Sequence, residues 1–567
     1  MSNQIIECVP NISEGRDELK IKAITDVIET VEGVMLLNVD PGKATNRTVI
    51  TFAGEPKAVI EAAFLVVKKA SELIDMSKHK GEHPRFGATD VCPLVPIANI
   101  SLEETVQYAH ELGEWIGKEL NIPIYFYENA AKSANRKNLA TVRKGEYEGL
   151  RDKLNDPTWT ADFGPKTYID AVAKTGATAV SARDFLVAYN INLNSTSTRR
   201  ANSIAFDIRE RGRVKREGDP ITGKIVKDEK GNPVNEPGLL KAVKGIGWFI
   251  EEYGIAQISY NLTNISITPI HVAFDKTCER AEARGLRVTG SELIGLVPKA
   301  ALIQAGKYFL QKQQRSLGIH DDEIIKIAVK SLGLDELAPF NIRERVIEYI
   351  LEDRMSQGKS KLVDMSLLKF ANETASESPA PGGGSISAYV GVLGVSLGTM
   401  VANLSSHKRG WDDKWEYYSE WAEKGQAYKD ELLRLVDEDT NAFNRIMDAF
   451  GLPKNSEAEK SVRKETILEA TKGATMVPFN IMEMALASME VMLEMAKSGL
   501  MASISDAGVG ALCARTAVRG AYLNVRINVK DMEAPEFVSD ILKRAEAIDN
   551  NATIIEKEIL ALVDNGL

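Results

Sequence analysis

The spacing of hydrophobic and polar positions changes near residue 360. Before that point, short β-rich runs such as VMLLNV (34–39) and IPIYFY (122–127) alternate with helical segments such as PKAVIEAAFLVVKKASELI (56–74). After it, apolar residues recur at helical spacing almost without interruption to the end of the chain. This change predicts an α+β N-terminal half, followed by an all-α helical C-terminal domain.

The alternation of β-rich runs and helical segments occurs twice in the N-terminal half, since a second set of strands and helices begins at DFLVAYNINL (184–193). We therefore predict two related subdomains, each made of antiparallel strands with helices. The charged stretch 213–238 has Asp-Pro and Gly-Asn-Pro turn signals and predicts a protruding hairpin or loop. The predicted boundaries are 1–181 and 182–351 for the subdomains, 352–360 for a polar linker and 361–567 for the helical domain.

One segment of the helical half, ISAYVGVLGVSLGTMVANL (386–404), carries no charge and is nearly long enough to cross a membrane. Its Gly, Ala and Ser content favours a helix packed tightly inside a bundle. Because no second span lies nearby, we expect no membrane partner.

The composition and net charge of the chain limit the classes of protein to which it can belong. The chain has 567 residues, of which 44% are hydrophobic, and a net charge of −10 without a long basic block. These values indicate a globular protein and argue against a nucleic-acid partner. Four scattered cysteines, and an N-terminus without a basic region followed by an apolar core, favour a reducing compartment such as the cytoplasm.

The segment SKHKGEHPRFGATDVCPLVPI (77–97) gathers two histidines, His79 and His83. Three cations lie beside them: Lys78, Lys80 and Arg85. Glycines and a proline interrupt the segment, so the histidines do not share a helix face, and no third metal ligand is evident. Positive neighbours lower the pKa of a histidine, which suits a general base in a loop. A surface histidine in a basic patch is an equally good interpretation of this pattern.

The helical half offers a carboxylate. In ELLRLVDEDTNAFNRIMDAF (431–450), Asp439 falls on an apolar stripe, three residues after Val436 and four before Phe443. We expect the pKa of such an acid to be raised by burial, as a general acid/base near neutral pH requires. The alternative is a structural aspartate bonded to a neighbouring helix.

A glycine-rich turn, PAPGGGS (379–385), opens the first long helix of this half. Three glycines allow backbone N–H groups to approach a ligand, and a helix start favours an anion. The turn lacks the ending of a nucleotide-binding P-loop, and a tight packing turn explains it as well.

Together these stretches resemble the formiminotransferase-cyclodeaminase family over nearly the whole chain. The matching stretches include ECVPNISEG, VDPGKATNRTVITF, DMSKHKGEHPRFGATDVCPLVP, GEYEGL, ADFGP, FLVAYNINL, PAPGGGS, LVDEDTNAF, SDAGVGA and GAYLNVRIN. The motifs of the helical half are short, but they occur in the order that the family has.

The resemblance implies a bifunctional folate enzyme of histidine degradation. The N-terminal half would move a formimino group from N-formimino-L-glutamate to N5 of tetrahydrofolate. The helical domain would then close the adduct to 5,10-methenyl-tetrahydrofolate and release ammonia. The family also implies polyglutamated tetrahydrofolate as co-substrate, no metal, and a homo-oligomer.

The resemblance places the transferase histidine at His83 and the cyclodeaminase aspartate at Asp439. We expect Asp40 to orient or polarise His83, and Arg85 to hold a carboxylate bidentately. The other predicted substrate-binding residues are Gly164 and Pro165 of ADFGP, and Gly382, Gly383, Gly384 and Ser385 of PAPGGGS.

Two other functions fit parts of the sequence. The chain could have transferase activity only, with the helical domain acting as an oligomerisation scaffold, although Asp439 and PAPGGGS argue against this. It could also be a folate-binding sensor without catalysis, but a binder has no use for His83 in its loop. The insert at 213–238 looks longer than the family pattern, as does KTYIDAVAKTGATAV after ADFGP, so no folate contact beyond Pro165 is transferred.

Overall fold

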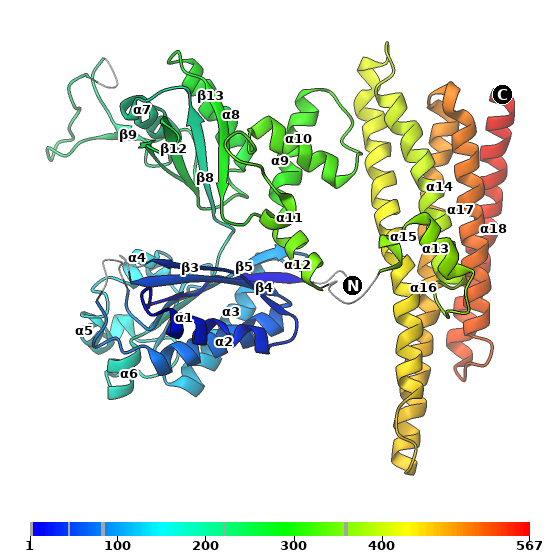
Figure 1. Cartoon of the computed structure of the whole chain (residues 1–567), viewed down its shortest axis with the longest axis horizontal. Coiled ribbons are helices and arrows are strands. Elements are labelled where there is room, and N and C mark those ends of the chain that lie inside the picture. Colours follow the sequence, from blue (N-terminus) through cyan, green and yellow to red (C-terminus); the bar gives the residue numbers. More distant parts are fainter. Residues whose placement is uncertain (1–3, 43–45, 81–84, 219–221, 356–360) are drawn as a thin grey trace. The chain divides into compact units, whose positions relative to one another are not determined.

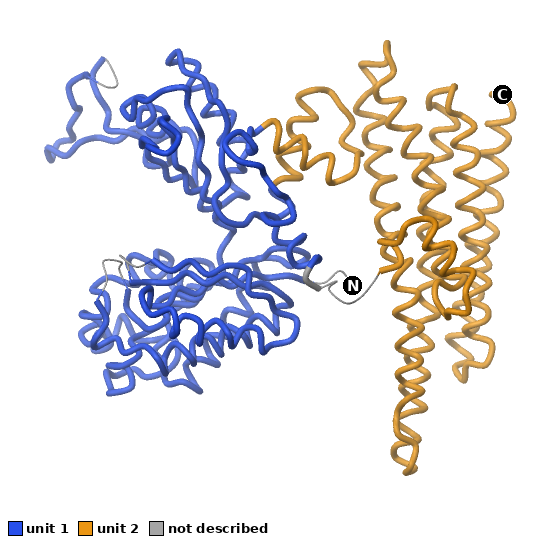
Figure 2. The backbone as a smooth tube through the Cα atoms, viewed as in Figure 1, with its two compact units in different colours: residues 1–301, 332–355 blue, residues 302–331, 356–567 orange. Residues whose placement is uncertain are grey.

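The computed structural model describes residues 4–42, 46–80, 85–218, 222–355 and 361–567. They form two compact units, shown in Figures 1 and 2. Unit 1 comprises residues 1–301 and 332–355 and contains every strand found among the described residues, whereas the described part of unit 2, which comprises residues 302–331 and 356–567, is helical. The predicted α+β half and the predicted all-α half are therefore confirmed.

The first sheet of unit 1 has seven strands. They are β1 (Ile5–Cys8), β2 (Asn11–Ile12), β3 (Val34–Gly42), β4 (Arg47–Gly54), β5 (Thr89–Ala98), β6 (Ile124–Glu128) and β7 (Thr178–Ala182). Their order is β1-β4-β2-β5-β7-β6, with β3 paired antiparallel to β4. The sheet is mixed rather than purely antiparallel, because β7 runs parallel to both β5 and β6. Helical crossovers before β7 make this parallel pairing possible.

Helices accompany this sheet in unit 1. They are α1 (Glu18–Thr25), α2 (Pro56–Leu73), α3 (Leu102–Leu120), α4 (Leu139–Val142), α5 (Leu150–Asn155) and α6 (Asp170–Thr175). The buried faces of α2 and α3 join one hydrophobic core with the strands. At the start of α3, the Ser101 hydroxyl accepts from Glu104 N at 3.1 Å, and the Glu104 carboxylate accepts from Ser101 N at 2.8 Å. This reciprocal pair is a capping box, which fixes where the helix begins.

The second sheet of unit 1 is antiparallel throughout, with the order β11-β12-β8-β13. Its strands and helices are β8 (Val187–Leu193), α7 (Thr198–Ile208), β11 (Val243–Ile250), β12 (Ile255–Leu262), α8 (Ile270–Glu282), β13 (Val288–Ile294), α11 (Ile342–Arg345) and α12 (Ile347–Met355). The insert 213–238 contains a separate two-stranded sheet of β9 (Arg213–Val214) and β10 (Asn235–Glu236). The predicted hairpin there is confirmed.

Helices build unit 2. They are α13 (Leu367–Thr374), α14 (Gly383–Ser406), α15 (Trp415–Phe450), α16 (Glu457–Ser498), α17 (Ile504–Asn528) and α18 (Pro535–Gly566), joined by α10 (Asp321–Leu332) and most of α9 (Lys299–Lys312). Short 3-10 turns across the whole chain are η1 (Ile28–Thr30), η2 (Ala134–Arg136), η3 (Pro157–Trp159), η4 (Leu362–Asp364), η5 (Asp412–Lys414) and η6 (Met501–Ser503). Segment 302–331 packs here because Leu317 N donates to Ser419 Oγ at 2.9 Å and Lys307 pairs with Glu423 at 2.6 Å. The predicted domain boundaries, which place this segment in the second subdomain, stay a prediction.

The apolar helix α14 lies in the bundle core. Gly394 packs so closely against α17 that a Cβ there would lie 2.7 Å from Gly510 O. By length and composition, α14 and α16 could each cross a membrane, yet 61% and 56% of their most apolar windows are buried inside the bundle. Small residues on α14 therefore serve close helix packing, as predicted from their density.

The apolar stripe around Asp439 is only partly buried, which corrects the simple expectation from its spacing. Leu432 and Val436 are fully buried, but Phe443, Met447 and Phe450 are 41%, 52% and 50% exposed. Figure 1 shows why, since the end of α15 and the start of α16 extend beyond the neighbouring helices.

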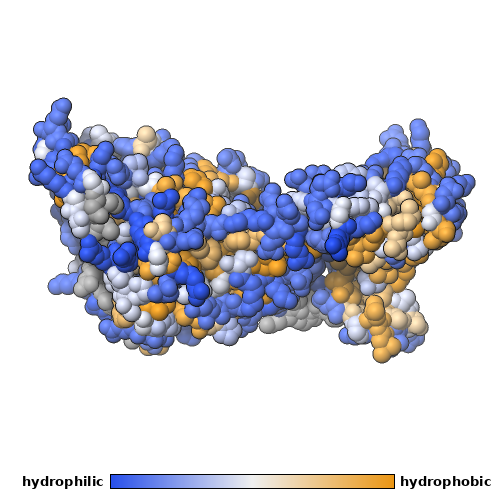
Figure 3. All heavy atoms as spheres, turned by 90° about the horizontal axis from the view of Figure 1, so that it is seen from above, coloured by the Kyte–Doolittle hydropathy of each residue, from blue (hydrophilic) through white to orange (hydrophobic). Residues whose placement is uncertain are grey.

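Further apolar side chains are exposed on α14 and α17. They are Leu393, Met400, Leu404, Val509, Leu512, Leu523 and Ile527. Figure 3 shows hydrophobic atoms, in orange, at the surface of the helical unit on the right of the view. Apolar surface of this kind favours contact with another subunit, and the homo-oligomer stays a prediction.

Candidate active sites

The predicted transferase histidine, His83, lies outside the described residues, but part of its loop is described. His79 Nε2 lies 2.9 Å from Asn46 O, and Arg85 Nε donates to His79 Nδ1 at 3.3 Å. Because a carbonyl only accepts, Nε2 carries the proton of a neutral ring. Burial, and to a lesser extent the charge of Arg85, lower the pKa of His79. This part of the loop therefore keeps an imidazole neutral.

Arg85 is buried and already engaged with the chain's own carboxylates. Its Nη2 donates to Glu148 Oε1 at 2.8 Å, and its Nη1 donates to Glu148 Oε2 and Glu146 Oε2, both at 3.0 Å. These bonds, most of all those donated to Glu148, raise the pKa of the guanidinium and tie Arg85 to the GEYEGL motif. Its binding of a substrate carboxylate stays a prediction.

Asp40 lies exposed on β3, paired in register with Val49, and its role toward His83 also stays a prediction.

Backbone geometry and local hydrogen bonds explain the residues of the ADFGP motif (161–165). Gly164 has φ +78°, and a Cβ there would lie 2.2 Å from Ile122 O, so only glycine fits. Asp162 Oδ2 accepts from Phe126 N and from Arg136 Nη1, both at 2.9 Å, which pins the motif to β6. Pro165 follows, partly exposed. Folate contact by Gly164 and Pro165 stays a prediction beside this packing role.

Asp90 is an acidic residue that the sequence pattern did not single out. It is fully buried at the start of β5, where Phe86 N donates to Oδ1 at 3.1 Å and Arg143 Nη2 lies 2.6 Å from Oδ2. Burial raises its pKa to about 6, although the charge of Arg143 acts in the opposite direction. The signal in the sequence was an acid directly before the apolar run VCPLVPI.

In the helical unit, the start of α14 meets the middle of α15. Ser385 N donates to Asp439 Oδ2 at 2.9 Å, and the Ser385 hydroxyl is shared between Val436 O at 2.8 Å and Asp439 Oδ2 at 3.2 Å. A Cβ at Gly384 would lie 2.1 Å from Asp439 Oδ1, so glycine is required where the carboxyl lies on the helix start. The anion at this helix start is thus the protein's own carboxylate.

The environment of Asp439 raises its pKa, as its place on the apolar stripe predicts. Burial is the dominant cause, and the two bonds from Ser385 act in the opposite direction by favouring the ionised form. Oδ1 receives no hydrogen bond from the described part of the chain. One oxygen is therefore anchored while the other remains available to a ligand.

A cavity of about 140 Å³ opens beside this carboxyl. It is lined by Pro379, Ala380, Gly382, Gly383, Asp439, Thr440, Phe443, Ile446, Ala474, Asn524 and Asn528. The structure thus brings Gly382, Gly383 and Asp439 together, with Gly384 and the buried Ser385 against the same carboxyl. The sequence pattern did not single out Asn524 and Asn528, although their spacing of four within GAYLNVRIN indicated one helix face.

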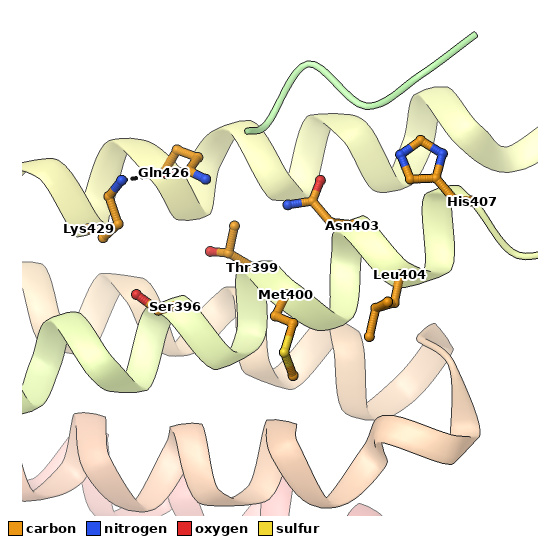
Figure 4. Close-up of a pocket in the computed structure, with 8 residues that line it drawn as sticks. All are labelled: Ser396, Thr399, Met400, Asn403, Leu404, His407, Gln426 and Lys429. Carbon is orange, nitrogen blue, oxygen red and sulfur yellow. Dashed lines mark hydrogen bonds between the residues drawn. The ribbon is translucent and has the colours of Figure 1, made fainter. Parts of the chain in front are cut away.

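A larger cavity, of about 390 Å³, lies further along α14 (Figure 4). It is lined by Ser396, Thr399, Met400, Asn403, Leu404, His407, Gln426 and Lys429. Gly318 O accepts from Asn403 Nδ2 at 2.9 Å and from Gln426 Nε2 at 3.1 Å, and Lys429 Nζ donates to Gln426 Oε1 at 2.6 Å. The titratable side chains that line it are His407 and Lys429, whereas the carboxyl of Asp439 lines the smaller cavity.

Neither cavity contains a metal site. Among the described residues, no three His, Cys, Asp or Glu side chains cluster closely enough to hold an ion. The chemistry available in the smaller cavity is proton transfer by a carboxyl with a raised pKa.

Comparison with known proteins defines the class as a transferase joined to a second catalytic module. Three family models match: "Formiminotransferase domain, N-terminal subdomain" at residues 5–183, "Formiminotransferase domain" at 188–352, and "Formiminotransferase-cyclodeaminase" at 366–547. The formimidoyltransferase-cyclodeaminase of Mus musculus is 40% identical over 551 residues, covering 96% of this chain and 97% of that protein. The protein of the same name from Gallus gallus is 40% identical over 561 residues, 99% of each chain.

A shorter relative matches about half of this chain. The glutamate formimidoyltransferase of Thermoplasma acidophilum is 40% identical over 309 residues, which is 54% of this chain and 92% of that protein. Because the full-length relatives are covered almost end to end, the chain belongs to the formimidoyltransferase-cyclodeaminase family of enzymes.

Proposed function

We propose that the chain catalyses two consecutive reactions on one carbon. The first transfers the formimino group of N-formimino-L-glutamate to N5 of tetrahydrofolate. The second closes 5-formimino-tetrahydrofolate to 5,10-methenyl-tetrahydrofolate and releases ammonia. End-to-end similarity to enzymes whose names contain both activities supports this pairing. The observation that supports the second step most directly is the half-buried Asp439 carboxyl, which lines a cavity at the start of α14.

For the transfer step, we assign the proton shuttle to His83. Attack by N5 on the amidine carbon gives a tetrahedral intermediate, from which the N5 proton must leave while another proton reaches the departing glutamate nitrogen. A single neutral imidazole can perform both transfers. The lowered pKa of His79, four residues away, supports an environment that keeps imidazoles neutral. Asp40 and Arg85 would orient the histidine and a substrate carboxylate, and Gly164 and Pro165 would contact folate.

For the cyclisation step, we assign the proton shuttle to Asp439. N10 attacks the formimino carbon, and the Asp439 carboxylate takes the N10 proton. The carboxylic acid then returns that proton to the formimino nitrogen, the carbon–nitrogen bond breaks, and ammonia leaves. No net proton is consumed when the amidine starts protonated, and a raised pKa matches an acid that must both take and return a proton.

Ser385→Ala should shift the pH dependence of cyclisation. Removing the hydroxyl deletes one hydrogen bond that favours ionised Asp439, so its pKa should rise further, while the bond from the backbone N remains. Because the carboxylate form takes the proton, the rate is lost as pH falls through this pKa. The acid limb of the pH–rate profile for supplied 5-formimino-tetrahydrofolate should therefore move to higher pH.

Ser387→Ala is the matched control, because the Ser387 hydroxyl donates to Gly383 O at 2.7 Å and does not contact Asp439. Its acid limb should coincide with that of the wild type. If the acid limb of Ser385→Ala stays in place or moves to lower pH, Asp439 is not the group whose ionisation produces that limb.

The remaining proposals concern the form of the folate, the cellular compartment, the oligomeric state and the role of metals. We propose that the folate is polyglutamated, that the chain works in the cytoplasm as a homo-oligomer, and that no metal takes part in either step. Exposed apolar side chains on α14 and α17 support an interface between copies.

A single assay tests the proposed pair of reactions. The chain is mixed with tetrahydrofolate and N-formimino-L-glutamate, and methenyl-folate absorbance and ammonia are followed together. We expect both to appear in equal amounts. A transferase with a scaffold domain would stop at the formimino adduct, and a folate sensor would give neither product.

A further inference from the structure

The smaller cavity is rich in hydrogen-bond acceptors. Asn524 Nδ2 donates to Gly520 O at 2.9 Å, and Asn528 Nδ2 donates to Ala474 O at 3.0 Å. These bonds set the nitrogen end of each carboxamide against backbone carbonyls. Neither Oδ1 atom receives a hydrogen bond from the part of the chain that the structure describes, and the same holds for Asp439 Oδ1. Three residues that line one cavity therefore each have an oxygen that accepts no hydrogen bond from the described part of the chain.

Glycines at the start of α14 allow this convergence. A Cβ at Gly383 would lie 3.0 Å from Asn524 Nδ2 and 3.3 Å from its Oδ1. A Cβ at Gly384 would lie 2.1 Å from Asp439 Oδ1. The glycine run thus places a carboxamide from α17 and a carboxyl from α15 against adjacent residues of one helix start.

The cavity presents one carboxyl, which accepts hydrogen bonds from Ser385 but has no cation beside it among the described lining residues. Its lining residues include one acid, Asp439, and no Lys, Arg or His. The pKa of Asp439 is set by burial and by Ser385, without a neighbouring cation. A carboxylate in such a place is stabilised best by a ligand group that is cationic and donates hydrogen bonds.

We propose that Asn524 and Asn528 determine specificity by holding the nitrogen that leaves as ammonia. This proposal depends on the assignment of cyclisation to the cavity beside Asp439. A protonated amidine presents planar N–H donors on that nitrogen, and the two Oδ1 atoms can accept them. The corresponding 5-formyl compound presents an oxygen that only accepts, so it would face acceptors without a donor.

The two asparagines would also hold the formimino nitrogen in place while it leaves as ammonia. The bond that breaks joins this nitrogen to the formimino carbon, and the proton that it gains comes from Asp439, which received it from N10. Asparagine oxygens that bind N–H groups of the amidinium keep the nitrogen beside the acid throughout. The site thereby distinguishes nitrogen from oxygen at one atom of an otherwise similar folate.

Asn524→Leu tests the proposal, with Asn441→Leu as control because Asn441 is exposed on α15 and does not line the cavity. The KM for supplied 5-formimino-tetrahydrofolate and the inhibition constant of 5-formyl-tetrahydrofolate are measured for each variant. In Asn524→Leu we expect KM to rise about tenfold or more, as loss of a hydrogen bond to a charged group implies. The inhibition constant for the formyl compound should stay level or fall, and Asn441→Leu should match the wild type.

The ratio of the two constants decides the outcome. If KM and the inhibition constant rise by the same factor in Asn524→Leu, or if neither changes, Asn524 does not distinguish the formimino nitrogen from the formyl oxygen. If thermal unfolding shows that Asn524→Leu does not fold, Asn528→Leu is judged by the same ratio. A wild-type chain that releases no ammonia would instead refute the proposed cyclisation, which separates the two failures.

Discussion

Asp439→Asn should slow cyclisation of supplied 5-formimino-tetrahydrofolate by about 10²–10⁴-fold, the usual contribution of a general acid/base. The carboxamide fits the same space and can still accept from Ser385, so the geometry at the start of α14 should persist. It has no titratable proton, however, and so cannot move one from N10 to the leaving nitrogen. Formimino transfer by the same variant should remain within about twofold of wild type, since an intact fold leaves the transferase histidine untouched.

Glu438→Gln is the matched control, one residue away on the same helix. Glu438 pairs with Arg445 at 2.8 Å at the surface, and it does not line the cavity. Both activities should survive in this variant. If Glu438→Gln lost cyclisation as fully as Asp439→Asn, the effect would belong to the charge of α15 and not to the carboxyl in the cavity.

His83→Ala should abolish formimino transfer and leave cyclisation of supplied 5-formimino-tetrahydrofolate unchanged. The transfer step needs one proton removed from N5 and one delivered to the glutamate nitrogen, and alanine can do neither. A loss of about 10²–10⁴-fold is expected when a general acid/base is removed. The rate of tetrahydrofolate consumption with N-formimino-L-glutamate measures it.

Lys78→Ala provides the comparison within the same loop. Lys78 is highly exposed and pairs with Asp75 at 3.0 Å, so its loss should cost little in stability. Transfer should continue in this variant at close to the wild-type rate. Retention of more than about a tenth of the transfer rate in His83→Ala would be too small a loss for the proton shuttle.

Local patterns predicted most of the elements because their causes are local. The hairpin of β3 and β4 follows from two alternating runs and a turn, and the start of α3 follows from Ser101 and Glu104. The parallel pairing of β7 with β5 and β6 was not predictable, because strand pairing depends on contacts distant in sequence. The docking of segment 302–331 onto the long helices is a tertiary contact of the same kind.

Burial was predicted less well than periodicity. Spacing alone placed Phe443 on the same stripe as Leu432, yet the first is exposed toward the end of α15 and the second is in the core. Hydrophobic spacing defines a helix face, but only the neighbouring helices decide how far that face is covered.

The candidate sites show the same limit. The sequence identified Asp439 and Ser385 separately, and their hydrogen bond joins residues 54 positions apart. Asn524 escaped notice because an asparagine on a helix is usually a surface residue, and only the close approach of Gly383 gives it a role. Arg85 stays a predicted ligand of a substrate carboxylate, and its bonds to Glu146 and Glu148 are contacts that no local spacing reveals.

Ammonia release from supplied 5-formimino-tetrahydrofolate is the most direct test of two independent proton shuttles in the two halves. The rate is measured for wild type, His83→Ala and Asp439→Asn, after each variant is shown to be folded and assembled. Wild type and His83→Ala should release ammonia at the same rate, and Asp439→Asn should be at least about 100-fold slower. Equal loss in both variants, or full activity in Asp439→Asn, would contradict the assignment of one shuttle to each half.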